Sequence, residues 1–348
     1  MPLSPFKAFQ DIIGQEKAIR FLKSVIQLGK MPHAYLFTGI PGVGKTTTAL
    51  ALAQAVNCEQ PVEYQGCRAC KTCRQIEHGN FPDLVTVEPE GQNIKIEQIR
   101  EINRNLNYKP ISGKYRVSII QQAETLTLEA ANSFLKTLEE PPPDNILILN
   151  VIEPRDLLST IVSRCQRVAF RPLTAPVISA YLSKEHGIEE EKADLLAKIA
   201  EGSLGRAQIL VEDDFLEKRQ EFIEGVVRLQ SRGVSAEQTI EMAEDYSSTD
   251  RRGGSSINRQ NSYLSQLLGV WKSWYRDLIL LKVRGPRELL INIDFSNKLR
   301  DISRNLKLER LIDSLLVIDQ AHRDYIQFRN RDLLVENMML DLKDLARG

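Results

Sequence analysis

The stretch Ala34-Tyr-Leu-Phe-Thr-Gly-Ile-Pro-Gly-Val-Gly-Lys-Thr-Thr47 decides the fold class of this 348-residue chain. Its first five residues form a short apolar run, which predicts a buried β-strand at residues 34–38. Residues 39–46 then match the pattern G-x-x-x-x-G-K-[ST] in full. Apolar residues follow at helical spacing at Leu50, Ala53 and Val56. A strand, a glycine-rich turn and a helix in this order predict an α/β fold built around a phosphate-binding loop, or P-loop.

The P-loop motif also predicts the chemistry of its residues. Its glycines let backbone N–H groups converge on phosphate oxygens, and the N-terminus of the following helix adds a positive potential. Lys45 would reach the β- and γ-phosphates of ATP, and Thr46 would hold Mg²⁺. The alternative is a glycine-rich turn that binds no ligand, which the flanking strand and helix disfavour. The residues predicted to bind ATP or ADP here are Gly39, Gly42, Gly44, Lys45, Thr46 and Thr47.

Strand-like and helix-like segments alternate through the first half of the chain. Further strands are expected at residues 84–87, 117–120, 146–149 and 167–170. Nearly all-apolar strands between amphipathic helices predict a five-stranded parallel sheet that is covered on both faces. After Pro172 only helical patterns follow.

The expected domains are a P-loop domain at residues 1–171, a helical lid domain at 172–211 and an all-α domain at 212–348. The polar stretch Ser247-Ser-Thr-Asp-Arg-Arg-Gly-Gly-Ser-Ser256 interrupts the helical pattern of the last domain. Its composition predicts an exposed, mobile loop.

The composition is that of an ordinary globular protein, with 42% hydrophobic and 26% charged residues. Lysine plus arginine equals aspartate plus glutamate at 46 each, which argues against a protein that coats nucleic acid by charge alone. No apolar run reaches the roughly 18 residues of a membrane-spanning helix. Residues 1–10 lack the features of a secretory signal. We therefore expect a cytoplasmic protein with no membrane partner.

The acidic pair that supports hydrolysis at a P-loop is missing from its expected place. One acid should ligate Mg²⁺ and a second should polarise the attacking water. The best candidate strand, residues 117–120, is followed by Gln121-Gln122. Glutamine is uncharged, so it is a poor Mg²⁺ ligand and no general base. Glu88 also follows an expected strand, but Pro89 comes next and a group of cysteines comes shortly before, so we interpret Glu88 as a plain strand end.

Four of the five cysteines follow the spacing C-x8-C-x2-C-x2-C, from Cys58 through Cys67 and Cys70 to Cys73. Disulfides are disfavoured in the cytoplasm. The two overlapping C-x-x-C steps place thiolates on one tight turn, and Cys58 would complete a tetrahedron around structural Zn²⁺. An iron–sulfur cluster and a set of unrelated reduced cysteines are the alternatives. The sequence thus predicts a zinc module at about residues 58–73, whereas Cys165 is interpreted as a packing residue.

A series of motifs then occurs along the chain in a fixed order. These are Ile12-Ile-Gly-Gln15, His33-Ala-Tyr-Leu-Phe37, the P-loop, the four cysteines, Asn132-Ser-Phe-Leu-Lys-Thr-Leu-Glu-Glu-Pro141 and Ser163-Arg-Cys165. The series resembles bacterial clamp-loader AAA+ subunits of DNA polymerase III, strongly through about residue 210 and weakly beyond. The resemblance implies an AAA+ fold with a helical lid, and it implies that residues 212–348 form a collar that holds subunits together.

Within this family, Gln121-Gln122 departs from the γ/τ pattern and is similar to δ′. The chain also ends at Gly348, without the long extension expected of τ. The resemblance therefore implies a subunit that binds ATP without hydrolysing it, assembles with γ/τ and δ subunits, and helps to load the sliding clamp on primed DNA. The alternatives are a catalytically active, γ/τ-like ATPase motor and a zinc-dependent nucleic-acid-binding module. The neutral charge disfavours the last of these.

The resemblance also implies roles for residues outside the P-loop. Arg164 would be an arginine finger that reaches the ATP of a neighbouring subunit, with capping of a helix at residues 157–163 as the alternative. Arg206 would be a sensor-2 arginine and Asn150 a sensor-1 residue, both facing the nucleotide. Ile12 and Ile13 would pack near the adenine, with plain core packing as the alternative.

Contact with DNA is the least defined expectation. Four basic residues lie on or beside one expected helix, interleaved with Glu97 and Glu101, so a solvated face of mixed charge is favoured over a DNA-binding face. These basic residues are Lys95, Arg100, Arg104 and Lys109.

Overall fold

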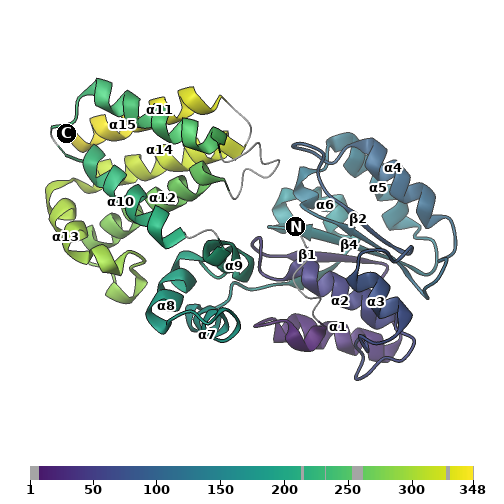
Figure 1. Cartoon of the computed structure of the whole chain (residues 1–348). Helices are drawn as coiled ribbons and strands as arrows, with labels where there is room; N and C mark the ends of the chain where they lie inside the picture. The colour runs from purple at the N-terminus through teal and green to yellow at the C-terminus, as the bar shows by residue number, and fades with distance from the viewer. Residues whose placement is uncertain (1–7, 213–214, 232, 253–261, 327–329, 348) are drawn as a thin grey trace. The chain divides into compact units, whose positions relative to one another are not determined.

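The computed structural model describes residues 8–212, 215–231, 233–252, 262–326 and 330–347. The chain divides into two compact units, which meet between Ala207 and Gln208. In Figure 1 the first unit runs from purple to teal and the second from green to yellow.

A parallel sheet forms the centre of the first unit. Its strand order is β2-β3-β4-β1-β5, and every neighbouring pair is parallel. The strands are β1 (Ala34–Thr38), β2 (Leu84–Val87), β3 (Arg116–Ile120), β4 (Asn145–Val151) and β5 (Gln166–Ala169). All five strands overlap the predicted ranges.

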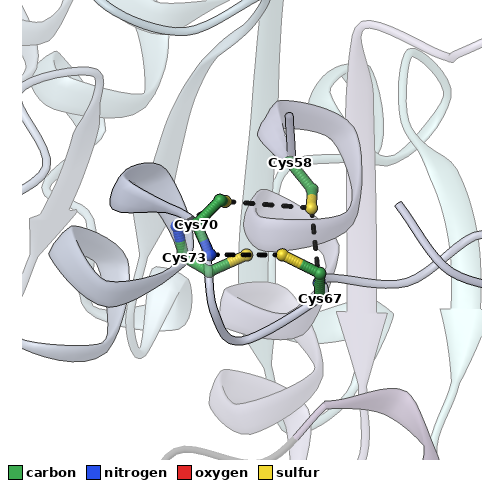
Figure 2. Close-up of side chains that lie close together, drawn as sticks. All are labelled: Cys58, Cys67, Cys70 and Cys73. Atoms are coloured by element: carbon green, nitrogen blue, oxygen red, sulfur yellow. Dashed lines mark hydrogen bonds between the residues drawn. The ribbon is translucent and has the colours of Figure 1, made fainter. Parts of the chain in front are cut away.

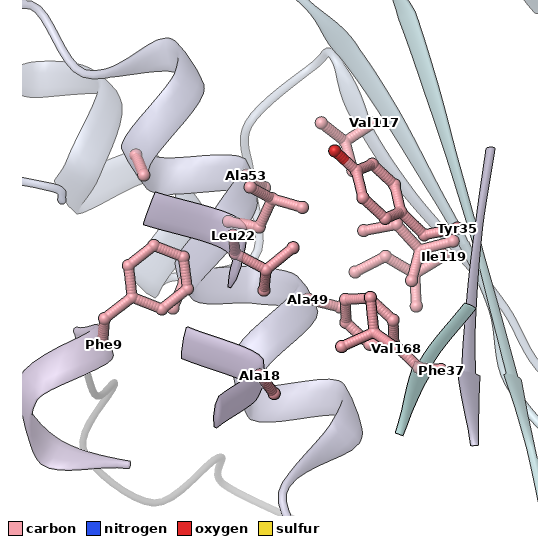
Figure 3. Close-up of a cluster of buried hydrophobic side chains, with 14 of the residues drawn as sticks. Phe9, Ala18, Leu22, Tyr35, Phe37, Ala49, Ala53, Val117, Ile119 and Val168 are labelled. Carbon is pink, nitrogen blue, oxygen red and sulfur yellow. The ribbon is translucent and has the colours of Figure 1, made fainter. Parts of the chain in front are cut away.

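Helices cover both faces of this sheet because the apolar side chains of each strand alternate in direction. Tyr35 and Phe37 lie in one core with residues of α1 (Glu16–Leu28) and α2 (Lys45–Asn57), as Figure 3 shows. Leu36 lies in a second core. The helices that contribute to the second core are α4 (Ile96–Leu106), α5 (Leu128–Glu139) and the short α6 (Ser159–Val162).

The fold class predicted from the sequence is confirmed. The P-loop follows β1 and leads into α2, within a five-stranded parallel sheet. The four clustered cysteines lie in an insert between α2 and β2, which also holds α3 (Lys71–Glu77). The chain thus has an α/β P-loop fold, and the described residues of its C-terminal part are helical.

A buried ion pair fixes the start of β3. Asp83 is fully buried and Arg116 is 4% exposed, and Arg116 Nη2 donates to Asp83 Oδ1 at 3.3 Å. The Asp83 carboxylate also accepts backbone N–H groups from Ile111, Ser112 and Gly113 at 2.7, 2.7 and 2.8 Å. Burial alone would raise the pKa of Asp83, but these N–H donors and Arg116 hold it below its usual value.

Helices alone follow the sheet within the described residues. The first unit continues into α7 (Ala175–His186), α8 (Glu190–Ile199) and the start of α9 (Leu204–Glu212). The second unit contains α10 (Phe215–Leu229), α11 (Ala236–Arg252), α12 (Tyr263–Lys282), α13 (Ser296–Asn305), α14 (Leu308–Ile326) and α15 (Arg331–Arg347). The predicted domains at residues 1–171, 172–211 and 212–348 stay predictions. None of the described helices has the length and apolar character needed to cross a bilayer.

The predicted loop at Ser247–Ser256 is wrong for its first six residues, which continue helix α11 to Arg252. Ser247 is 1% exposed and Asp250 is 5% exposed. The Asp250 carboxylate accepts the N–H of Leu264 at 3.0 Å and the hydroxyl of Tyr325 at 2.8 Å. These contacts come from distant parts of the chain, so the local polar composition could not reveal them. Residues 253–256 lie outside the described residues.

Candidate nucleotide site and metal centre

The P-loop requires glycine at Gly42 for two reasons. Its φ of +72° lies in the left-handed region that side chains disfavour. A Cβ atom there would also lie 2.4 Å from Ser203 Oγ and 3.2 Å from the Cα of Gly205. The loop between β1 and α2 is therefore packed directly against the start of α9.

Two hydrogen bonds hold this contact together. The N–H of Gly205 donates to the carbonyl of Gly42 at 2.9 Å, and Ser203 Oγ donates to the carbonyl of Pro41 at 2.8 Å. Arg206 lies on the same turn of α9, and its N–H donates to Ser203 Oγ at 3.1 Å. Its guanidinium pairs with Glu201 at 2.9 Å. The predicted sensor-2 residue thus starts from a backbone position beside the P-loop, with its charged group paired to Glu201.

Gln15 is a structural link to the P-loop that the sequence reasoning missed. This side chain is 3% exposed, and its Nε2 donates to the carbonyls of Val43 at 3.3 Å and Arg171 at 2.8 Å. Its Oε1 accepts the N–H of Arg171 at 3.1 Å. Gln15 closes the motif that begins at Ile12, but a polar residue outside a periodic segment gives no signal that it is buried.

Lys45 folds back onto the P-loop, where its ammonium donates to the carbonyl of Gly39 and to that of Ile40 at 3.1 Å. Burial lowers the pKa of Lys45 to about 8, an effect that the negative charge of Glu124 opposes. Glu124 is a second residue that the sequence reasoning missed. It lies on the short 3₁₀ helix Ala123–Thr125 after β3, and burial raises its pKa.

A network of uncharged side chains lies at the ends of β3 and β4. Thr46 Oγ1 donates to Gln121 Oε1 at 2.9 Å. Asn150 Nδ2 donates to the same Gln121 oxygen at 2.9 Å and to Thr46 Oγ1 at 3.3 Å. These bonds place the predicted sensor-1 residue Asn150 next to the P-loop, where its side chain is 1% exposed. Gln122, in contrast, is exposed and has a left-handed φ of +48°.

The other predicted nucleotide contacts are partly built into the core. Ile12 is 9% exposed and lies in the core with α1 and α2, and a Cβ on Gly44 would lie 3.8 Å from Ile12 Cγ2. Ile13 and Thr47 are half-buried. Their contact with adenine or phosphate stays a prediction. Glu88 follows the edge strand β2, and β3 and β4 separate that strand from β1.

Arg164 lies after α6 and makes the helix-end contact that was its alternative role. Its Nη1 donates to the carbonyl of Thr160 at 2.8 Å, and its Nη2 pairs with Glu139 Oε1 at 2.6 Å. The side chain is 34% exposed. A guanidinium has five N–H donors, so these two contacts hold it in place and leave donors for a further partner.

The basic residues considered for DNA contact lie on a face of mixed charge. All four are exposed, as are Glu97 and Glu101 on α4. They are Lys95, Arg100, Arg104 and Lys109. Acidic and basic side chains are thus interleaved on this exposed face, and its contact with DNA stays a prediction.

The four clustered cysteines converge on one point, as Figure 2 shows. Their sulfur atoms all lie within 4.8 Å of one another, and the Cys58 and Cys70 sulfurs are 4.0 Å apart. Tetrahedral zinc with Zn–S bonds of about 2.3 Å requires sulfurs about 3.8 Å apart. Four thiolates at this spacing fit Zn²⁺, and they fill every position of a tetrahedron. These ligands suit a structural metal that leaves no open position for catalysis.

Backbone N–H groups point at these sulfurs. The amides of Cys67, Cys70 and Cys73 donate to the sulfurs of Cys58, Cys67 and Cys70 at 3.3, 3.3 and 3.4 Å. The N–H groups of Cys70 and Ala69 lower the pKa of the Cys67 thiol to about 6. Burial raises the pKa of Cys58 and Cys73 and so disfavours their thiolates. A bound cation would offset this effect by stabilising the thiolates.

The cysteine insert is fastened to α2, the helix that starts at Lys45. Gln54 Nε2 donates to the carbonyl of Cys73 at 3.1 Å. A Cβ on Gly66 would lie 2.8 Å from Gln54 Oε1 and 3.2 Å from the Cys73 sulfur, so only glycine fits there. Arg68 also pairs with Asp11. A metal in this cluster would therefore stabilise the far end of the P-loop helix.

Comparison with known proteins shows which proteins this chain is similar to. The family model described as DNA polymerase III, delta subunit matches residues 14–174. The chain is 29% identical to the delta′ subunit of Bacillus subtilis over 335 residues, which cover 95% of this chain and 96% of that subunit. It is also 29% identical to the tau subunit of Bacillus subtilis over 329 residues, or 91% of this chain. The chain spans 58% of the length of that tau subunit.

Among solved structures, the chain is similar to a DNA polymerase III gamma subunit-related protein from Thermotoga maritima. The two are 19% identical, with a TM-score of 0.45 over 94% of this chain and 99% of the other. The sequence relatives and the matched family model bear out the resemblance that the motifs carry. The chain is therefore a homologue of the delta′ and tau/gamma subunits of DNA polymerase III, the clamp-loader family that its motifs resemble.

Proposed function

We propose that this chain is a delta′-like subunit of a DNA polymerase III clamp loader in the cytoplasm. It assembles with gamma/tau and delta subunits through its helical C-terminal unit and helps to load the sliding clamp on primed DNA. The similarity to the Bacillus delta′ subunit supports the assignment, because it extends over 335 residues and 96% of that subunit. We also propose that its four cysteines bind one structural Zn²⁺.

The single observation that carries the proposal is the position of the Gln121 side chain next to Thr46. This side chain accepts the Thr46 hydroxyl at 2.9 Å, at the place where a hydrolytic P-loop needs a carboxylate. Gln122, which follows it, is exposed and uncharged. Neither glutamine can remove a proton from water, so the site is suited to bind nucleotide and unsuited to hydrolyse it.

The catalytic contribution of the chain is then made to a neighbour. An arginine finger offsets the negative charge that develops on the γ-phosphate during hydrolysis. Arg164 suits this role because its ion pair with Glu139 and its bond to Thr160 fix the guanidinium, while a third of the side chain stays exposed.

The test is reconstitution of the complex with gamma/tau and delta subunits, using this chain or its Arg164→Ala variant. The turnover at the adjacent ATP site should fall by about 10³-fold or more, so the total ATPase should fall by the share of that one site. The isolated variant should lose at most about 1 kcal/mol of stability, the usual value of an exposed ion pair.

Arg155→Ala is the matched control. Arg155 lies nearby on the 3₁₀ helix Pro154–Asp156, pairs with Glu153 at 2.6 Å and is 80% exposed. Its removal takes away the same charge and a similar ion pair. Equal ATPase in complexes with the Arg164→Ala chain and the unaltered chain would return Arg164 to the helix-end role.

One observation favours a second candidate, an active gamma/tau-like ATPase. Glu124 is a carboxylate whose charge acts on Lys45, and it lies three residues after Gln121. If it served as the base, the purified chain would turn over ATP alone at an ordinary enzymatic rate, and Glu124→Gln would abolish that turnover. Such turnover would replace the delta′-like proposal, and its loss in Glu124→Gln would identify the base.

A further inference from the structure

The network around Gln121 has no negative charge to offer a metal ion. The carbonyl oxygen of Gln121 accepts two hydrogen bonds, from Thr46 Oγ1 and from Asn150 Nδ2, each at 2.9 Å. Both lone pairs of that oxygen are therefore engaged within the protein. Asn150 Nδ2 also points at the Thr46 hydroxyl oxygen, at 3.3 Å. A cation next to Thr46 would face the Gln121 carbonyl oxygen, whose lone pairs already accept hydrogen bonds, and the amide N–H donor of Asn150.

These residues do not fit Mg²⁺. This ion demands octahedral oxygen ligands and is usually held by one or two carboxylates together with the phosphates of the nucleotide. The Thr46 hydroxyl is the ligand that the P-loop itself offers the ion, and it donates its proton to an uncharged amide. An amide oxygen attracts the cation far less than a carboxylate does.

Glu124 does not restore the missing charge. Among the described residues, it is the carboxylate whose charge acts on Lys45, so the ammonium already offsets it. Burial disfavours its ionised form, and the nearby Asp156 adds to that effect.

The same atoms suit phosphate oxygens. The amide of Asn150 and the ammonium of Lys45 are donors, and the N-terminus of α2 adds a positive potential. A nucleotide without Mg²⁺ keeps the full negative charge of its phosphates, so these groups attract it more strongly than its magnesium complex.

We propose that this P-loop takes ADP or ATP as the free nucleotide, without a coordinated divalent cation. The inference rests on the proposed nucleotide binding and adds to it the chemical form of the ligand. Nucleotide affinity should then be weaker with Mg²⁺ than without it, because Mg²⁺ draws the nucleotide into a complex that this site attracts less. A P-loop with an acidic partner should behave in the opposite way.

The experiment is a calorimetric titration of the full chain with ADP and with ATP, in buffer that contains either MgCl₂ or EDTA. The dissociation constant should be at least about threefold larger in MgCl₂ than in EDTA, for ATP as for ADP. Gln121→Asp places a carboxylate next to Thr46, and it should make binding in MgCl₂ at least about tenfold tighter than in EDTA. EDTA can also strip structural zinc, so the zinc content is measured after each titration.

Gln122→Asp is the matched control for added charge. It makes the same change at the adjacent position, but that side chain is exposed and makes no contact with Thr46 among the described contacts. The affinity of this variant should stay weaker in MgCl₂ than in EDTA, as that of the unaltered chain does.

The outcomes separate the two proposals. Equal affinity of the unaltered chain in the two buffers, or affinity that is weaker in EDTA, would overturn the metal-free form and leave nucleotide binding intact. If Glu124→Gln removed that dependence, the metal ligand would be Glu124. No binding in either buffer would overturn nucleotide binding itself, and this inference with it.

Discussion

The contact between Gly42 and the start of α9 gives a sharp prediction, because the chain contains a matched control. Gly42→Ala and Gly29→Ala each place alanine at a positive φ, +72° and +65°, at a cost of about 1 kcal/mol. A Cβ on Gly29 has no atom within 4 Å, whereas a Cβ on Gly42 would lie 2.4 Å from Ser203 Oγ. Only the Gly42 variant should therefore push α9 away from the P-loop.

The extra cost at Gly42 follows from the two hydrogen bonds that the displacement breaks, those of Gly205 and Ser203 with the P-loop carbonyls. At about 1 kcal/mol each they amount to about 2 kcal/mol, or about 30-fold in an equilibrium constant. Hydrogen exchange measured by mass spectrometry should show the Gly205 amide exchanging about 30-fold faster in Gly42→Ala and unchanged in Gly29→Ala. Equal protection of that amide in the two variants would refute the proposed packing of α9 on the loop.

Three further predictions concern the metal, the pH dependence and the buried ion pair. Elemental analysis should find about one zinc per chain and much less in Cys73→Ser, and an iron absorbance band would contradict this assignment. Because burial lowers the pKa of Lys45 to about 8, the site without nucleotide loses this ammonium as the pH rises through that value, and bound phosphate favours its retention. Below about pH 8 the titration of Lys45 should therefore leave the nucleotide affinity unchanged, and above about pH 8 the affinity should fall. A rise in affinity above that pH would contradict the role of Lys45. Asp83→Ala leaves the Arg116 guanidinium buried without its carboxylate, so urea denaturation should show a loss of about 3–5 kcal/mol, and a loss below about 1 kcal/mol would contradict this account.

Local patterns predict much of this fold because they report local physics. The sheet follows from apolar runs such as Ala34–Thr38, and the P-loop follows from a motif whose strand and helix are both adjacent in sequence. The cysteine cluster follows from spacing, because two C-x-x-C steps confine their thiolates to one turn. Each of these signals is complete within a short segment.

What the sequence did not predict depends on contacts between distant segments. Gln15 gave no signal of its buried position, which its bonds to Val43 and Arg171 create. The polar stretch from Ser247 to Arg252 resembled a loop, yet Asp250 is held by a tyrosine far along the chain. Glu124 lies two residues beyond Gln122, outside the motif positions, and only the fold brings its charge to Lys45. Tertiary contacts override local propensity at these positions.

The contacts that complete the P-loop also impose an order on how the chain folds as it is made. Gln15 bonds to a residue 156 positions later, and Pro41 accepts a hydrogen bond from a residue 162 positions later. At synthesis rates of about 5–20 residues per second, the ribosome needs roughly 10–30 s to make the later partners after the loop itself has been made. During this interval β1 also lacks its neighbours β4 and β5. The nucleotide site is therefore among the last parts of the first unit to be assembled, and a nascent chain that stops before Ser203 leaves it unfinished.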